Sequence, residues 1–89
     1  MKVDVYDTYA TSASRTTIHF DVLVPTETSS ETAFAYARQW LDKVGLGDAE
    51  LKQSRCNFCH SEKADARVVS DIETDGFHII RMEGCPQGS

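Results

Sequence analysis

The sequence predicts an α+β domain: a two-layer sandwich in which a four-stranded mixed sheet carries two helices on one face, in the order β-β-α-β-α-β. Two segments alternate apolar and polar residues with the period of two that is typical of strands, and two later segments suit an edge strand and a central strand. Two further segments repeat apolar residues with the period of an α-helix. The chain has 89 residues, 40% apolar and 26% charged, which is enough for one core and too little for two.

The first two predicted strands cover residues 2–9 and 18–24. In the later strand every even position is apolar, while His19 and Asp21 point to the other face. The Ser/Thr-rich link between the two strands is too short for a crossover, so we expect an antiparallel hairpin. Pro25 has no N–H to donate and should end the pairing.

The first predicted helix begins at Thr28, which has capping-box spacing with Glu31. Its apolar residues fall within an arc of about 120°, so the helix should lie on the sheet. Gly45 is the expected left-handed end of this helix. Trp40 and Phe34 belong to the apolar stripe, and we interpret them as core residues rather than as a platform for a ligand.

The second half of the chain should supply two more strands and a helix. Residues 49–56 are weakly apolar and suit an exposed edge strand. Asp65 is the best N-cap for a helix over 66–75, which leaves 56–64 as an irregular knuckle. The last strand covers 77–83 and is apolar on both faces, which is typical of a central strand.

This topology would bring the cysteines together. If both helices make right-handed crossovers, the second, third and fourth strands run parallel, and their C-terminal ends share one edge of the sheet. Cys56 and Cys59 follow the third strand and Cys85 follows the fourth, so the three thiols should converge. One domain over residues 1–86 would contain them, and we expect 87–89 to be a frayed or vector-derived tail.

Charge and cysteine usage exclude several classes of protein. Nine basic and fourteen acidic residues give a net charge of −5, the wrong sign for nucleic acid or an anionic membrane surface. No stretch has the apolar length of a membrane span, and the N-terminus lacks a secretory apolar run. An odd number of cysteines argues against a secreted disulfide framework. We therefore expect a cytoplasmic protein that binds neither nucleic acid nor membrane, and the sequence identifies no partner.

Residues 56–60, Cys-Asn-Phe-Cys-His, are the best candidates for chemistry. Two thiolates at C-x-x-C spacing can grip one metal ion, and zinc prefers tetrahedral sulfur and nitrogen ligands. Cys85 would add a third sulfur and His60 a fourth ligand, although sequence neighbours rarely point at the same ion. The leading hypothesis is a non-enzymatic domain that binds zinc through Cys56, Cys59, His60 and Cys85.

Two other interpretations of the same residues stay open. Cys56 and Cys59 could cycle between dithiol and disulfide in a small oxidoreductase. Alternatively, the cysteines only pack the core of a partner-binding module, because buried free cysteines behave as small apolar residues. Covalent c-type haem also uses C-x-x-C-H, but a sheet with its own apolar face leaves haem no core to occupy. Elsewhere the chain has no complete dinucleotide, phosphate-loop or nucleophile-elbow motif.

Four stretches together give the chain a resemblance to a known family. They are Val-Tyr-Asp-Thr-Tyr at 5–9, His-Phe-Asp-Val-Leu-Val-Pro at 19–25, Cys-Asn-Phe-Cys-His-Ser-Glu at 56–62 and Met-Glu-Gly-Cys at 82–85. The chain resembles, over nearly its whole length, the prokaryotic family known as domain of unknown function 2024. The resemblance implies an α+β domain of this length and names no activity. It also draws attention to His19 and Asp21 as a second polar surface, where a solvent-facing hydrogen-bonded pair is the plainer interpretation.

Overall fold

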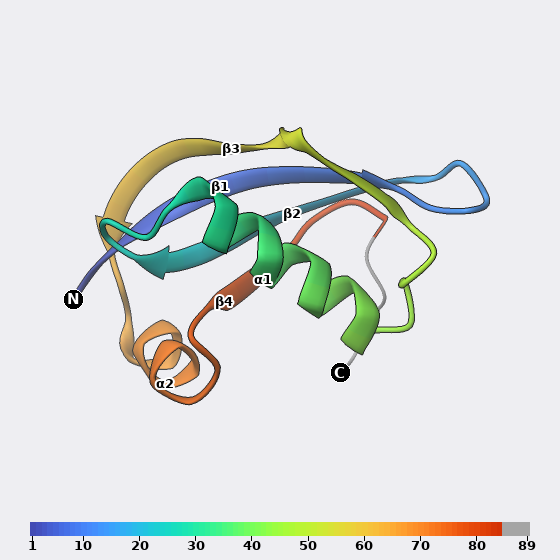
Figure 1. Ribbon diagram of the computed structural model, residues 1–89. Helices are drawn as coiled ribbons and strands as arrows, with labels where there is room; N and C mark the ends of the chain where they lie inside the picture. The colour runs from blue at the N-terminus through green and yellow to red at the C-terminus, as the bar shows by residue number, and fades with distance from the viewer. Residues whose placement is uncertain (85–89) are drawn as a thin grey trace.

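The computed structural model describes residues 1–84 and confirms the α+β class and the element order (Figure 1). The strands are β1 (Lys2–Thr11), β2 (Thr17–Pro25), β3 (Glu50–Lys63) and β4 (His78–Arg81), and the helices are α1 (Ser30–Lys43) and α2 (Ala66–Asp75). They form one sheet in the order β3-β1-β2-β4, so β3 and β4 are its edges. The domain end predicted at 86 and the tail predicted at 87–89 lie outside the described residues.

All three pairings of the described strands are antiparallel, so the prediction of a mixed sheet is wrong. The expected hairpin of β1 and β2 is confirmed, and β2 and β3 do run in the same direction, with β1 between them. β4 runs opposite to β3, because it pairs antiparallel with β2. The C-terminal ends of β3 and β4 therefore lie at opposite ends of the sheet. The parallel arrangement that was expected to bring Cys85 to Cys56 is absent, and Cys85 itself lies outside the described residues.

The helix α1 covers one face of the sheet. Its buried residues pack against the even-numbered side chains of the hairpin, which share this face because strand residues alternate. The core on this side comprises Tyr6, Ala10, Ile18, Phe20, Val22, Val24, Ala33, Ala37, Trp40, Leu41, Ala49, Cys56 and Phe77. Trp40 is 5% exposed and its ring centroid lies 4.6 Å from that of Phe20, which confirms its interpretation as a core residue.

Both helices have the kinds of caps that the sequence indicated. Ser29, one residue after the predicted Thr28, accepts a hydrogen bond from the Thr32 N–H at the start of α1. Asp65 caps α2 as predicted, and Gly76 ends it with a φ of 93°. The predicted bounds of this second helix are therefore confirmed.

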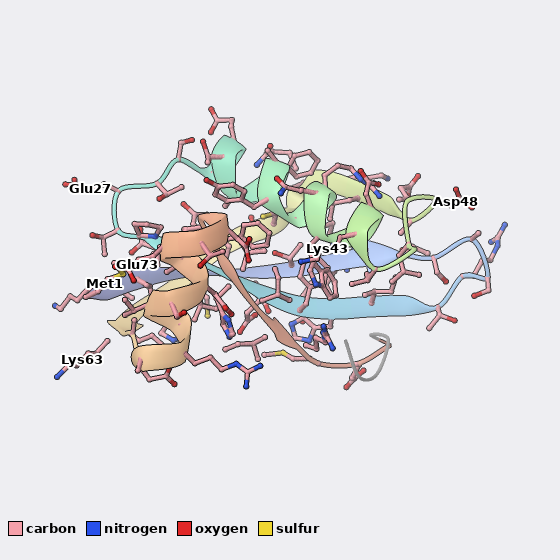
Figure 2. All side chains as sticks on the ribbon, turned by 90° about the horizontal axis from the view of Figure 1, so that it is seen from below. Met1, Glu27, Lys43, Asp48, Lys63 and Glu73 are labelled. Carbon is pink, nitrogen blue, oxygen red and sulfur yellow. The ribbon has the colours of Figure 1, made fainter. Side chains whose placement is uncertain are left out.

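The helix α2 packs against the other face of the sheet, so the two helices do not share one face as the sequence suggested. Its Val68 and Ile72 form a second core with Val3, Val5 and Leu23, which alternate with the α1-facing residues. The link from β3 to β4 begins opposite Lys2 and ends opposite Leu23, near the same end of the sheet. A ten-residue helix therefore crosses this end instead of running back along the strands (Figure 2).

The strand β3 is continuous from Glu50 to Lys63, so the irregular knuckle predicted at 56–64 is wrong. The register with β1 skips residues 52–55, but residues 56–63 pair with β1 except at Cys59. This polar stretch, which could have formed a turn, therefore satisfies its backbone hydrogen bonds in a ladder. The strand is interrupted by register shifts, one of which is a bulge. Phe58 and His60 pair with neighbouring residues of β1, which makes Cys59 the extra residue. The edge position expected for this strand is confirmed, whereas β4, expected to be central, forms the other edge.

The second core generates a prediction about stability. Ile72→Ala should lower the free energy of unfolding by about 2–4 kcal/mol, because it leaves a cavity between α2 and the sheet. Ile80→Ala makes the same change at a side chain that is 38% exposed and should cost about 1 kcal/mol or less. Urea unfolding followed by circular dichroism measures both. Equal losses for the two variants would contradict the packing of α2 on this face.

Candidate functional site

The part of the second face that lies beyond α2 carries a cluster of three ligating side chains: Asp7, His19 and Asp21. Asp7 and Asp21 are directly opposite each other in the β1–β2 hairpin, and His19 lies two residues before Asp21, on the same face. One potential ligand atom from each residue lies within 4.8 Å of the other two. Within residues 1–84 no other group of three histidine, cysteine or carboxylate side chains is this close.

The imidazole of His19 is held in place from two sides. Its Nε2 lies 2.5 Å from Oδ1 of Asp7, and the side chain is only 20% exposed. Its ring stacks on that of Tyr9, with 4.1 Å between centroids and 7° between planes. The guanidinium of Arg55 on β3 lies 5.1 Å from the centroid of the Tyr9 ring. These contacts fix the ring against the sheet, so one nitrogen faces the carboxylates without further ordering.

Two carboxylates directly opposite each other on adjacent strands repel when both are ionised. The pKa of Asp21 is raised to about 6, first by burial, then by the hydrogen bond that protonated Asp21 donates to Asp7 and by the negative charge of Asp7. His19 and His60 lower that pKa and only partly offset these effects. Asp21 therefore exchanges a proton close to neutral pH. A half-buried carboxylate whose pKa is raised by a neighbouring negative charge is stabilised by binding either a proton or another cation.

Cys56, the first cysteine of the predicted zinc site, lies inside the core under α1. It is 3% exposed, and its Sγ accepts a hydrogen bond from Oγ1 of Thr8 at 3.5 Å. Burial raises the pKa of the Cys56 thiol, and the hydrogen bond from Thr8 acts against this. A neutral thiol packed among apolar residues fits the interpretation of Cys56 as a core residue.

Cys59 and His60 lie at the bulge of β3 and are exposed. His60 Nδ1 lies 3.3 Å from Cys59 Sγ, and His60 Nε2 lies 2.8 Å from Oε1 of Glu62. The side chains of these sequence neighbours thus lie on the same side of the bulge. Cys56 and Cys59 are both free thiols and lie beyond disulfide distance. Because Cys85 lies outside the described residues, the four-residue zinc site stays a prediction.

Sequence reasoning singled out His19 and Asp21 but missed Asp7, to which His19 is bonded. The predicted hairpin contained the information needed to identify Asp7. On the odd face of the first strand, Val3 and Val5 are followed by Asp7, and the hairpin register sets this residue opposite Asp21. A polar residue that interrupts an apolar face, directly across from another, is a mark of a functional or strained position.

Comparison with known proteins identifies the family. A family model described as domain of unknown function (DUF2024) matches residues 1–82. The chain belongs to this family.

The DUF2024 chain is also similar to a protein of known structure. This is NE1680 from Nitrosomonas europaea, a structural genomics target solved by NMR. The two are 38% identical, the match covers 97% of this chain and 100% of that chain, and the TM-score is 0.84. No curated protein matches the DUF2024 chain. The comparisons therefore confirm the resemblance and the fold and assign no activity. Within residues 1–84, no helix is long and apolar enough to cross a membrane.

The raised pKa of Asp21 predicts a pH dependence of stability. Because the folded-state value of about 6 exceeds the ordinary 3.8, the folded protein holds this proton more tightly than the unfolded chain. The contribution of Asp21 to stability therefore decreases as the pH rises between these two values. Asp21→Asn, which mimics the protonated acid, should stabilise the fold at pH 8 by an amount on the order of 1 kcal/mol, after discounting for solvent screening.

At pH 4 the variant Asp21→Asn and the unmodified protein should differ little, because Asp21 is then protonated in the fold. Thermal unfolding between pH 4 and pH 8 measures this difference. Asp48→Asn, in the exposed loop before β3, is the matched control and should leave the pH profile unchanged. A destabilising effect of Asp21→Asn at pH 8 would count against the electrostatic account.

Proposed function

We propose that this protein binds a divalent transition-metal ion, with zinc as the first choice, through Asp7, His19 and Asp21. The proposal depends on one observation, that three potential ligand atoms from two adjacent strands lie within 4.8 Å of one another. Zinc–ligand bonds of roughly 2.0–2.2 Å to imidazole nitrogen and carboxylate oxygen would need only a small rotation of these side chains. One imidazole and two carboxylates suit zinc and manganese better than a soft thiol-seeking metal.

The position of the cluster supports metal binding in two ways. The ligands come from a paired hairpin, and sites built on strands are held more precisely than sites on loops. The three side chains lie on the part of the face that α2 does not cover, and three protein ligands leave a coordination position for water or a substrate. This is the ligand count of metal sites that take part in reactions, although no reaction is assigned here.

Protons and metal should compete for Asp21. A carboxylate binds a metal ion only when it is ionised, so binding must release the proton that Asp21 holds below pH 6 or so. The mutual repulsion of Asp7 and Asp21, which raises that pKa, is removed by a cation placed between them. Metal affinity should therefore rise between pH 5 and pH 7.

The metal site is tested by calorimetric titration of the metal-free protein with zinc chloride at pH 7. His19→Gln and Asp21→Asn should each weaken binding at least about tenfold, because each removes one ligand. His78→Gln is the matched control. His78 Nδ1 lies 2.6 Å from Asp71 in a similar pair, to which residues 1–84 add no third ligating side chain. Unchanged affinity in His19→Gln would refute the proposal.

The zinc site predicted from Cys56, Cys59, His60 and Cys85 is the second candidate. Two contacts favour it: the approach of His60 to Cys59 and the bond of its other nitrogen to Glu62. Metal-bound histidines commonly donate their second N–H to a carboxylate in this way. Cys56 would have to leave the core under α1, which weighs against its participation.

The two candidates differ in which variants lose zinc. For a cysteine site, Cys59→Ser should release bound zinc while His19→Gln retains it, and the Asp–His–Asp proposal expects the reverse. Elemental analysis of protein purified without added metal gives the zinc content per chain.

A thiol–disulfide role for Cys56 and Cys59 would require the two free thiols to move together. The cytoplasmic location and the absence of nucleic-acid partners remain predictions from charge and cysteine usage.

A further inference from the structure

A hollow of about 620 Å³ lies along the outer edge of β4, between the two helices. Trp40 and Lys43 of α1 line one side, Arg67 and Asp71 of α2 line the other, and β4 forms the floor. Figure 2 looks at this edge and shows the labelled Lys43 on the α1 side, to the right of α2. None of these residues belongs to the Asp–His–Asp cluster. We refer to this hollow as the β4 groove.

The backbone of β4 is open towards the groove. This strand pairs with β2 on one side only, and it forms the lower edge of the sheet in Figure 1. The Met82 N–H donates to the His19 carbonyl, and hydrogen-bonded positions alternate in antiparallel pairs, so Ile80 also bonds inward. The N–H and C=O groups of Ile79 and Arg81 therefore point outward. Two donors and two acceptors at this spacing can pair with a short extended segment.

The charge of the β4 groove is opposite to that of the whole chain. The protein has a net charge of −5, yet three of its nine basic residues, Lys43, Arg67 and Arg81, line the groove. None of the three forms an ion pair with a described residue. Two acidic residues also line the groove: Asp71, which is bonded to His78 at 2.6 Å, and Asp75, so three basic side chains face two acidic ones and the net charge of the lining is slightly positive. The groove thus offers unpaired positive charge to a bound segment.

The two sides of the groove match the alternation of a strand. A segment added beside β4 would direct alternate side chains towards α1 and towards α2. Lys43 and Arg81 are on the α1 side. The guanidinium of Arg81 lies 5.9 Å from the centroid of the Trp40 ring. Arg67 is on the α2 side. We propose that the β4 groove binds an extended acidic peptide segment of a partner protein, which adds to the sheet as a fifth strand beside β4.

Trp40 is the only tryptophan in the chain and lines the groove, so its fluorescence reports on binding directly. The probe is a capped pentapeptide that alternates glutamate and valine. It should change the Trp40 emission saturably and bind at least about tenfold more tightly than the same peptide with lysine in place of glutamate. A version with N-methyl groups on alternate residues keeps its charge and cannot pair with the strand edge. This version should lose most of the binding.

Variants identify the site. The double variant with Lys43→Gln and Arg67→Gln should weaken the acidic peptide at least about fivefold, because it removes two charges from the groove. The double variant with Lys52→Gln and Lys63→Gln removes the same charge from the opposite edge strand and should bind normally. Circular dichroism of each variant checks that the fold is retained.

Four results would overturn the proposal. Equal binding of the N-methylated peptide, or full competition by inorganic phosphate, would show an anion site without strand addition. Equal binding of the lysine peptide would show that the groove does not select acidic segments. Sedimentation equilibrium that shows a dimer sensitive to the Lys43→Gln and Arg67→Gln variant would mean that a second copy of this chain occupies the edge. The groove and the metal cluster are tested independently, because His19 and Asp21 do not line the groove and Lys43 and Arg67 do not belong to the cluster.

Discussion

The pairing of β1 with β2 determines the position of nearly every residue that matters in this protein. Its register runs from Val3 opposite Pro25 to Thr11 opposite Thr17, which places even-numbered side chains under α1 and odd-numbered ones on the other face. A slip of one residue would move the whole apolar set of β2 into solvent and its polar set under the helix. The core under α1 therefore holds the register, and the register in turn sets Asp7 opposite Asp21.

The sheet face that α2 covers has an apolar part and a polar part, and the boundary lies where the odd-numbered hairpin residues change from apolar to polar. Near the N-terminus, Val3, Val5 and Leu23 accept α2, whereas the continuation of the same face carries Asp7 and Asp21. The cluster consequently lies beside the helix and not beneath it. Partial burial, together with the hydrogen bond to Asp7 and the charge of Asp7, raises the pKa of Asp21 to about 6. A more buried position would raise that pKa further, and a fully solvated one would leave it near the ordinary value.

Local sequence signals predicted the elements well and their arrangement less well. Signals between residues close together in the sequence were enough for some elements. Alternation predicted the hairpin, and the N-cap Asp65 and the glycine that ends α2 predicted the bounds of that helix. The direction of β4 and the face of α2 depend on where a distant chain end returns, and a ten-residue helix can either cross the end of a sheet or run along it. Asp7 was missed for a related reason, since its significance depends on its cross-strand partner and not on its neighbours in sequence.

The cysteine motif illustrates how backbone conformation decides what a spacing means. In a tight turn, C-x-x-C brings two thiols to one ion. In an extended strand, residues three apart lie roughly 10 Å apart along the backbone, and β3 is extended around the motif because residues 56–63 pair with β1 except at Cys59. The pairing of β1 with β3 keeps Cys56 and Cys59 apart, whereas the pairing of β1 with β2 brings a histidine and two aspartates together. The geometry of the proposed metal site in this chain thus follows from the register of the β1–β2 hairpin, and the C-x-x-C motif departs from a regular strand only at the Cys59 bulge.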